Sequence, residues 1–287
     1  MSTGPAGHVA RSTAVPNSET SRRTPIRTFL RTKDGVPIDS VYEPGAVVYD
    51  AGTPSSSDLV FVIAHGFTGD VDRPHVRRVA TAFAQYGAVV TFSFRGHGRS
   101  GGRSTVGDKE VLDLAAAVAW ARELGHPRVV TVGFSMGGSV VLRHGALYGS
   151  EHVGRTEART DAVVSVSAPA RWYYRGTAPM RRVHWLVTRR EGRLVTRYGL
   201  RTRIHHRRWD PVPLSPVESV PRIAPTPLLI VHGDRDGYFP VDHPRMLAEA
   251  AGDHGELWLE AGMGHAEHAA ADELLARIGH WALGRAG

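Results

Sequence analysis

The sequence predicts an α/β fold: a mostly parallel central sheet with helices on both faces and a short inserted cap. From residue 59 onward, short apolar runs with the length of strands alternate with segments whose apolar residues recur at helical spacing. That alternation is typical of parallel sheets, whose crossover helices cover both faces. It stops at about residues 170–213 and then resumes. We therefore expect a sheet with an insertion, and chemistry at the carboxyl ends of its strands.

The first elements are predicted by a turn signal. Residues 27–32 and 36–42 flank the pair Asp34-Gly35, which is typical of a β-hairpin. Residues 46–49 are expected to continue this pairing or to add a strand.

The later elements are predicted by apolar periodicity. Residues 59–64 are wholly apolar, as expected of a buried strand, and the segment 108–124 places Val111, Leu114 and Val118 on one helical face. Further strands are expected at residues 88–94, 128–132, 161–167, 228–231 and 256–260. Further helices are expected at residues 74–86, 136–147, 244–251 and 266–283.

The composition, 41% hydrophobic and 22% charged, is that of a globular protein. The absence of cysteine excludes a disulfide scaffold, a thiolate nucleophile and any Cys-ligated metal, and it fits the cytoplasmic location that we expect. No run approaches the ~18 apolar residues of a membrane-spanning helix. Residues 1–24 are polar and lack the apolar run of a secretory signal, so we expect a disordered basic tail. The folded domain is expected over residues 25–287, with the cap at about 170–213.

The net charge of +7 is unevenly distributed. Residues 1–33 and 171–210 are strongly basic, and the rest of the chain is acidic. The second segment holds twelve arginines against Glu191 and Asp210. Four interpretations stay open: a lid whose arginines are merely solvated, a surface that steers anionic substrates, a peripheral contact with anionic lipid, and a nucleic-acid surface. We favour the lid, and we expect no nucleic-acid partner because no nucleic-acid-binding fold surrounds the segment.

A candidate nucleophile follows the strand expected at 128–132. Residues 133–137 read Gly-Phe-Ser-Met-Gly and lead into a helix, and a G-x-S-x-G pattern in this position is typical of a nucleophile elbow. The glycines let the chain turn tightly, so that the hydroxyl of Ser135 stands above the sheet. The helix N-terminus at that point favours developing negative charge. We therefore predict that Ser135 is a nucleophile.

A serine nucleophile needs a base, and the base needs an orienting acid. His265 lies between a glycine-rich turn and the last helix, after the strand expected at 256–260. Asp234 and Asp236 both lie in the loop after the strand expected at 228–231. The chain order serine, acid, histidine is typical of such a triad. The residues alone leave both acids open.

These pieces resemble the serine hydrolases of the α/β-hydrolase superfamily, over about residues 27–283. Two further matches are His-Gly-Phe-Thr-Gly at residues 65–69 and Arg-Gly-His-Gly-Arg-Ser at residues 95–100. The resemblance implies an oxyanion hole formed by the backbone N–H groups of Phe67 and Met136.

The resemblance also bears on the acid and on nearby histidines. In this superfamily the last residue of a His-Gly-x-x-Asp motif is catalytic, which implies Asp236. Asp234 is then expected to form a turn or to contact the lid. His97 is expected to shape the turn beside the pocket and to take no part in catalysis.

The closest resemblance is to monoacylglycerol-lipase-like esterases and small serine aminopeptidases. It implies an ester hydrolase that needs no cofactor and forms an acyl-enzyme intermediate on Ser135 with a small-molecule acyl substrate. Thioesterase, peptidase or amidase activity stays open, as does a non-catalytic binding protein of the same fold. A serine at the elbow disfavours dehalogenase and epoxide hydrolase chemistry, because those relatives use an aspartate there.

The cap contributes aromatic side chains. Four of these are expected to contact substrate: Trp172, Tyr173, Trp185 and Trp209. We expect no metal site, because neither of two nearby histidine pairs has an evident carboxylate partner. The pairs are His265 with His268, and His205 with His206.

Overall fold

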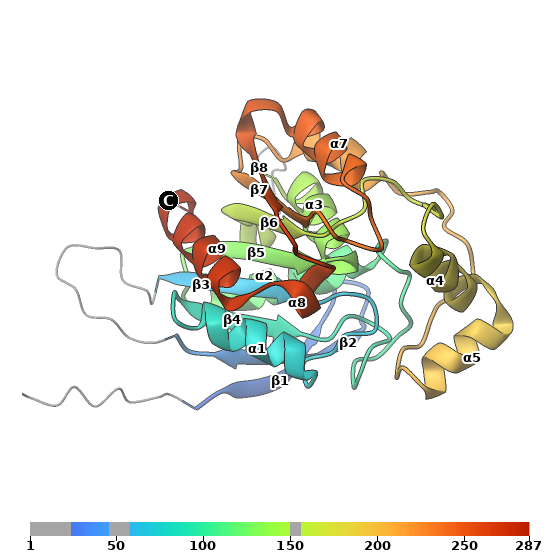
Figure 1. Cartoon of the computed structure of the whole chain (residues 1–287). Helices are drawn as coiled ribbons and strands as arrows, with labels where there is room; N and C mark the ends of the chain where they lie inside the picture. The colour runs from blue at the N-terminus through green and yellow to red at the C-terminus, as the bar shows by residue number, and fades with distance from the viewer. Residues whose placement is uncertain (1–23, 46–57, 150–155, 287) are drawn as a thin grey trace, which may run out of the picture.

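An eight-stranded sheet runs through the computed structural model, which describes residues 24–45, 58–149 and 156–286 (Figure 1). The strands are β1 (Ile26–Arg31), β2 (Pro37–Glu43), β3 (Leu59–Ala64), β4 (Ala88–Phe92), β5 (Arg128–Phe134), β6 (Ala162–Val166), β7 (Leu228–Gly233) and β8 (Gly255–Glu260). Their spatial order is β1-β2-β4-β3-β5-β6-β7-β8. The β1–β2 and β2–β4 pairs are antiparallel, and β4 through β8 form a parallel array. The predicted, mostly parallel sheet is confirmed.

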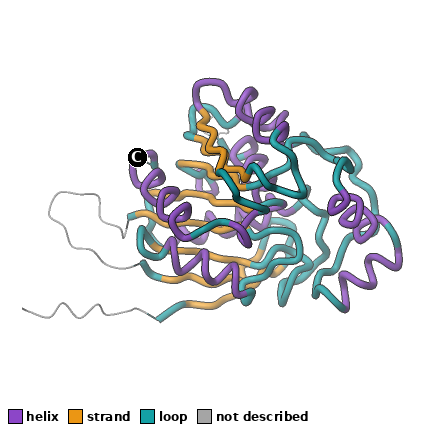
Figure 2. Tube along the Cα trace, viewed as in Figure 1, coloured by secondary structure: helices purple, strands orange, loops and turns teal. Residues whose placement is uncertain are grey.

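Helices cover both faces of this sheet (Figure 2). They are α1 (Pro74–Phe83), α2 (Glu110–Glu123), α3 (Met136–Leu147), α6 (Pro216–Ser219), α7 (Asp242–Ala251), α8 (Ala266–Ala269) and α9 (Asp272–Arg285). One apolar cluster joins α1 and α9 to the sheet, and a second joins α2, α3 and α7 to its other face. Successive side chains of β3 alternate between the two clusters, which is why this strand is apolar throughout.

The C-terminal helical segment differs from its prediction. A single helix was expected over residues 266–283, but the chain forms α8 and α9, with extended backbone between them at Ala270 and Ala271. The guanidinium of Arg78 donates to the carbonyl oxygens of Glu267, at 2.9 Å, and of Ala270, at 2.7 Å. A side chain from α1 thus binds carbonyl groups that a continuous helix would use itself. The strand expected at residues 46–49 lies outside the described residues, as does nearly all of the tail expected at 1–24.

A long excursion, residues 171–214, leaves the sheet after β6 and returns before β7; we call it the insert. It contains α4 (Ala178–Thr188) and α5 (Arg190–Tyr198), which stand beyond the carboxyl ends of the strands (Figure 1). The indole N–H of Trp172 donates to the carbonyl of Pro213, at 3.0 Å, and so closes the base of the insert. β-bridges His97–Thr202 and Ser104–Ile204 attach its far end to the loop after β4. Among the described helices, none is long and apolar enough to span a bilayer.

Candidate active site

Ser135 occupies a sharp turn between β5 and α3. Its backbone has φ 53° and ψ −111°, a strained conformation for a residue with a Cβ atom. A Cβ atom at Gly133 would collide with the carbonyl of Gly137, and a Cβ atom at Gly137 would collide with the carbonyl of Ala64. Both glycines of the predicted elbow are therefore required sterically, and the turn they permit exposes the Ser135 hydroxyl at the end of the sheet.

Three predicted side chains meet at this turn. The Nε2 atom of His265 lies 2.9 Å from Ser135 Oγ, and its Nδ1 atom lies 2.8 Å from Asp236 Oδ2. A carboxylate accepts only, so Nδ1 carries the proton and Nε2 is left as the acceptor of the serine hydroxyl. The loops after β7 and β8 thus hold an acid and a base in line with the serine at the end of β5.

The two candidate acids have different partners. Asp236 is buried, and its Oδ1 atom accepts the backbone N–H groups of Tyr238, at 2.8 Å, and Phe239, at 3.1 Å. Burial by itself would raise the pKa of Asp236. The hydrogen bond to His265, the attraction to the positive charge of that imidazole and the two N–H groups outweigh the burial, so the pKa of Asp236 is lowered. Asp234 instead accepts the N–H of Gly262, at 2.7 Å, so it ties two loops together without contacting His265.

Further groups surround Asp236 and His265. The ring of Tyr238 stacks on His265, with ring centroids 4.2 Å apart. His232 Nε2 donates to the carbonyl of Phe239, at 2.8 Å, and lies 3.5 Å from Asp236 Oδ2. The N–H groups two and three residues after an aspartate are typical Asx-turn donors, so Tyr238 and Phe239 could have been expected to bind Asp236. Ring stacking has no comparable signal in the sequence.

The expected oxyanion donors lie at the mouth of the same turn. Phe67 and Met136 line the cavity beside Ser135, and neither backbone N–H is hydrogen-bonded to another described residue. The Met136 N–H is an orphan donor of the first turn of α3. The preceding residue, Gly66, donates its N–H to the carboxylate of Glu267, at 3.0 Å. Glu267 therefore joins the turn of Phe67 to the segment of His265, a role that the sequence analysis missed.

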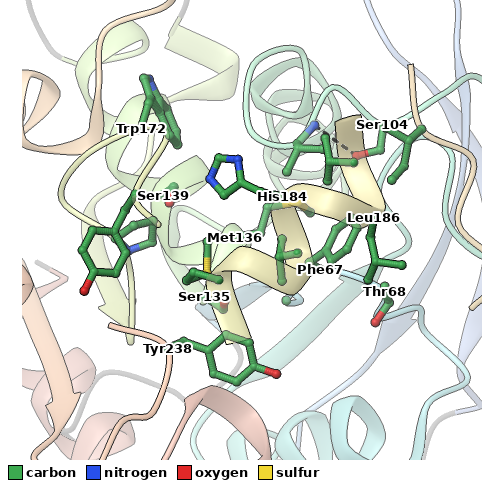
Figure 3. Close-up of a pocket in the computed structure, with 18 of the residues that line it drawn as sticks. Phe67, Thr68, Ser104, Ser135, Met136, Ser139, Trp172, His184, Leu186 and Tyr238 are labelled. Carbon is green, nitrogen blue, oxygen red and sulfur yellow. Dashed lines mark hydrogen bonds between the residues drawn. The ribbon is translucent and has the colours of Figure 1, made fainter. Parts of the chain in front are cut away.

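A cavity of about 800 Å³ lies beside Ser135 (Figure 3). Trp172, Tyr173 and Trp209 line it, and the two indole rings pack edge to face with centroids 5.1 Å apart. Trp185 does not line the cavity: it is half exposed, because α4 turns its neighbours Leu186 and His184 toward the cavity instead. His97 is also absent from the lining, being fully buried with its Nδ1 atom 3.1 Å from the carbonyl of Arg95.

A smaller groove of about 330 Å³ adjoins this cavity, and Arg193, Ile204 and His206 line both. We call it the arginine groove, after the five arginines that line it: Arg103, Arg190, Arg193, Arg197 and Arg203. Burial, followed by the charges of its arginine neighbours, lowers the pKa of Arg203. Within the described residues no carboxylate pairs with any of the five, so the groove is an electropositive extension of the cavity.

A sequence model of the Alpha/beta hydrolase family matches residues 59–278, which span strands β3 to β8 and include Ser135, Asp236 and His265. The chain belongs to this family. A monoacylglycerol lipase of Mycolicibacterium smegmatis is 30% identical to this hydrolase over 230 residues, which cover 71% of this chain and 79% of that protein.

Solved structures give the same fold. An esterase of Pyrococcus furiosus superposes with a TM-score of 0.68 at 24% identity, covering 99% of this chain and all 100% of that one. Est1E of Butyrivibrio proteoclasticus, solved with ferulic acid bound, superposes with a TM-score of 0.58 at 19% identity, covering 90% of this chain and 98% of that one. The expected α/β-hydrolase fold is therefore confirmed.

Proposed function

We propose that this α/β hydrolase is a serine ester hydrolase of the carboxylesterase or lipase type, working through an acyl-enzyme on Ser135. The observation that carries the proposal is the hydrogen-bonded series from Ser135 to His265, at 2.9 Å, and from His265 to Asp236, at 2.8 Å. The similarity to a monoacylglycerol lipase and to esterases supports an ester as the bond that is cleaved.

The geometry supports a definite division of labour. Ser135 Oγ attacks the ester carbonyl while His265 Nε2 takes its proton, and the ionised Asp236 stabilises the resulting imidazolium. The N–H groups of Phe67 and Met136 bind the oxyanion, each worth about 3 kcal/mol of the barrier. His265 then protonates the leaving alcohol. A water molecule, activated by the same imidazole, releases the acid and restores the serine.

The insert acts as a cap that selects the substrate. Its aromatic and aliphatic side chains, among them Trp172, Leu186 and Trp209, give the cavity apolar surface for an acyl chain. A cavity of about 800 Å³ is large enough for one acyl chain and a small alcohol. The substrate class is therefore a monoacyl ester of a small alcohol, as in the named relative from Mycolicibacterium smegmatis.

The outer side of the insert supports a peripheral contact with anionic lipid. On α5, Leu194, Val195 and Tyr198 are exposed, Tyr198 to 74%, and they adjoin Arg193 and Arg197 in the chain. Apolar side chains interleaved with arginines are typical of helices that lie on anionic bilayers. We expect the protein to co-sediment with vesicles of anionic lipid but not with vesicles of zwitterionic lipid. Binding to both kinds of vesicle equally, or to neither, would contradict the proposed lipid contact.

A fluorophosphonate probe tests the nucleophile directly. The native protein should be labelled, and Ser135→Ala should not be labelled and should lose about 10⁴ to 10⁶ in kcat, because the triad acts as a unit. Ser215→Ala, at a serine that caps α6, is the matched control and should be labelled like the native protein. Labelling of Ser135→Ala would disprove the assignment.

The same preparation separates the alternatives. Hydrolysis rates are measured on nitrophenyl esters of increasing chain length, on monoacylglycerols, and on thioesters and amides with the same acyl group. We expect the highest rates for the esters. Preference for a thioester or an amide would make the protein a thioesterase or amidase of the same fold. A protein that is neither labelled nor active would be a binding protein, a role that the intact series of Ser135, His265 and Asp236 disfavours.

A further inference from the structure

Three potential metal ligands gather beside the triad without belonging to it. His75 lies in the first turn of α1, and Glu267 and His268 lie on α8. One ligand atom from each of the three lies within 4.8 Å of the other two. His75 Nε2 is 3.8 Å from Glu267 Oε1, and the two imidazole rings are 4.0 Å apart between centroids. No carboxylate partner for His268 was evident in the sequence, but the preceding residue, Glu267, supplies one.

The contacts of this cluster leave its ligand atoms available. In the part of the chain that the structure describes, neither imidazole is hydrogen-bonded to a protein group. Glu267 is only 4% exposed, and the single hydrogen-bond donor to its carboxylate among the described residues is the Gly66 N–H. A carboxylate has about four acceptor positions, so Glu267 can keep that hydrogen bond and still bind an ion.

The chemistry of the three groups selects the ion. Two imidazoles and one carboxylate form the donor set that Zn²⁺ and its neighbours in the first transition series prefer, and a hard cation such as Mg²⁺ would favour an all-oxygen set. In a tetrahedral site with bonds of about 2.0 to 2.1 Å the ligands lie roughly 3.3 Å apart. The three groups must therefore approach by about 0.5 to 1.5 Å. The side chain of His268 is exposed, so rotation about its side-chain bonds can supply part of this adjustment.

We propose that His75, Glu267 and His268 bind one divalent transition-metal ion of the Zn²⁺ type. The site adjoins the cavity over Ser135, because Glu267 and His268 both line that cavity. The ion would link α1 to α8, the helix that directly follows His265. It would also share Glu267 with Gly66, so that occupancy stabilises the join between the oxyanion turn and the histidine loop.

Titration of the metal-free full-length protein with Zn²⁺ tests this directly. Isothermal titration calorimetry should give one ion per chain, and at a tenfold excess over Kd the ion should raise Tm by about 2 to 5 °C, reversibly with a chelator. His75→Gln should weaken binding about tenfold or more. Glu267→Gln should do the same, although its amide oxygen can still accept the Gly66 N–H. Binding is measured without substrate, so the result stands even if the proposed ester hydrolysis fails.

Two controls distinguish this cluster from other histidines. His280→Gln, on the exposed side of α9, should bind Zn²⁺ like the native protein. His265→Gln should also retain Zn²⁺ binding. If this variant no longer binds Zn²⁺, the ion is bound by His265 and the proposed site is wrong. If His75→Gln does not fold, judged by its Tm with chelator present, His268→Gln at the exposed position replaces it. Undiminished binding in both the Glu267→Gln variant and a histidine variant of the cluster would overturn the proposal.

Discussion

The sheet and the insert are held in opposite ways. All residues of the central strands β3, β4 and β6 are buried, with apolar clusters on both faces. In the insert, α4 buries none of its residues, and α5 buries only Gly192 and Thr196. Segments with so few buried contacts open locally at low cost. The proposed reacting groups therefore follow strands of the sheet, and most of the side chains that would choose the substrate stand on the loosely held insert.

The same contrast holds for charge. Arg95, in the loop after β4, is buried and donates to the carboxylates of both Asp34 and Asp113, which hold the loop in place. The arginine groove, lined by Arg103 and four arginines of the insert, has no carboxylate partner among the described residues. Paired charges in the sheet region serve structure, whereas unpaired charges of the insert are free for a ligand. Substitutions in the two regions should consequently differ in kind as well as in size.

The largest effect should come from the acid of the triad. Asp236→Asn should lower kcat by about 10³ to 10⁴, because an amide cannot hold the His265 imidazole in the tautomer that accepts from Ser135. Asp234→Asn should keep most of the rate, since its oxygen can still accept the Gly262 N–H. Steady-state kinetics on one nitrophenyl ester decides between the two. A larger loss in Asp234→Asn would move the acid to that position.

Acid should destabilise the protein through histidines of the sheet region. Burial lowers the pKa of His65 and of His144 to about 3, and that of His97 to about 4. Each stays neutral in the folded chain and takes up a proton near pH 6.5 once unfolded. Stability should therefore be fully present above that pH and be lost as pH falls from about 6.5 toward 4, by up to about 1.4 kcal/mol per pH unit for each group.

Urea unfolding at a series of pH values measures that slope. His144→Asn removes one of these groups and should reduce the slope below pH 6.5 by up to about 1.4 kcal/mol per pH unit, whatever its effect on stability at neutral pH. His206→Asn, at an exposed position of the insert, should leave the slope unchanged. Equal slopes in both variants would mean that the buried histidines do not govern acid unfolding.

Truncating one leucine in each region should sharpen the comparison further. Leu142 is fully buried on α3, and Leu142→Ala should cost about 2 to 5 kcal/mol through the cavity it leaves. Leu194 is 57% exposed on α5, and Leu194→Ala should change stability by less than about 0.5 kcal/mol. Denaturant midpoints measure both. A comparable loss in Leu194→Ala would show that the insert is packed far more tightly than its exposure indicates.

What the sequence could predict follows the same division. Strong apolar periodicity predicted the sheet and its helices, and local glycine geometry predicted the position of Ser135. Contacts between residues distant in the chain had no local signal in the sequence. Glu267 accepts the N–H of Gly66, 201 positions away, and Arg78 on α1 donates to the carbonyl of Ala270, where α8 ends. In the insert, the composition identified the aromatic residues but could not predict which way their side chains point. Trp185 was therefore expected to contact substrate, although it does not line the cavity.

The smallest effect should come from the arginine groove, and only on charged substrates. An unpaired cluster of arginines beside the cavity attracts an anionic ester, and salt weakens that attraction because exposed charges are screened over about 8 Å at physiological ionic strength. The value of kcat/KM for an anionic ester should fall several-fold between low and high salt. A neutral ester with the same acyl chain should barely respond.

Two sets of variants with equal charge locate that effect. Replacing Arg103, Arg190 and Arg197 with Gln should flatten the salt dependence for the anionic ester and leave the neutral ester unaffected, because these side chains line the groove and are hydrogen-bonded to no described residue. The matched set replaces three exposed arginines of the insert outside the groove: Arg182, Arg189 and Arg201. It removes the same charge, so it should retain most of the salt dependence if the groove is the binding surface. Equal flattening by both sets would mean that the groove contributes only its share of a diffuse field, and an equal response of both esters would leave the arginines as a solvated face.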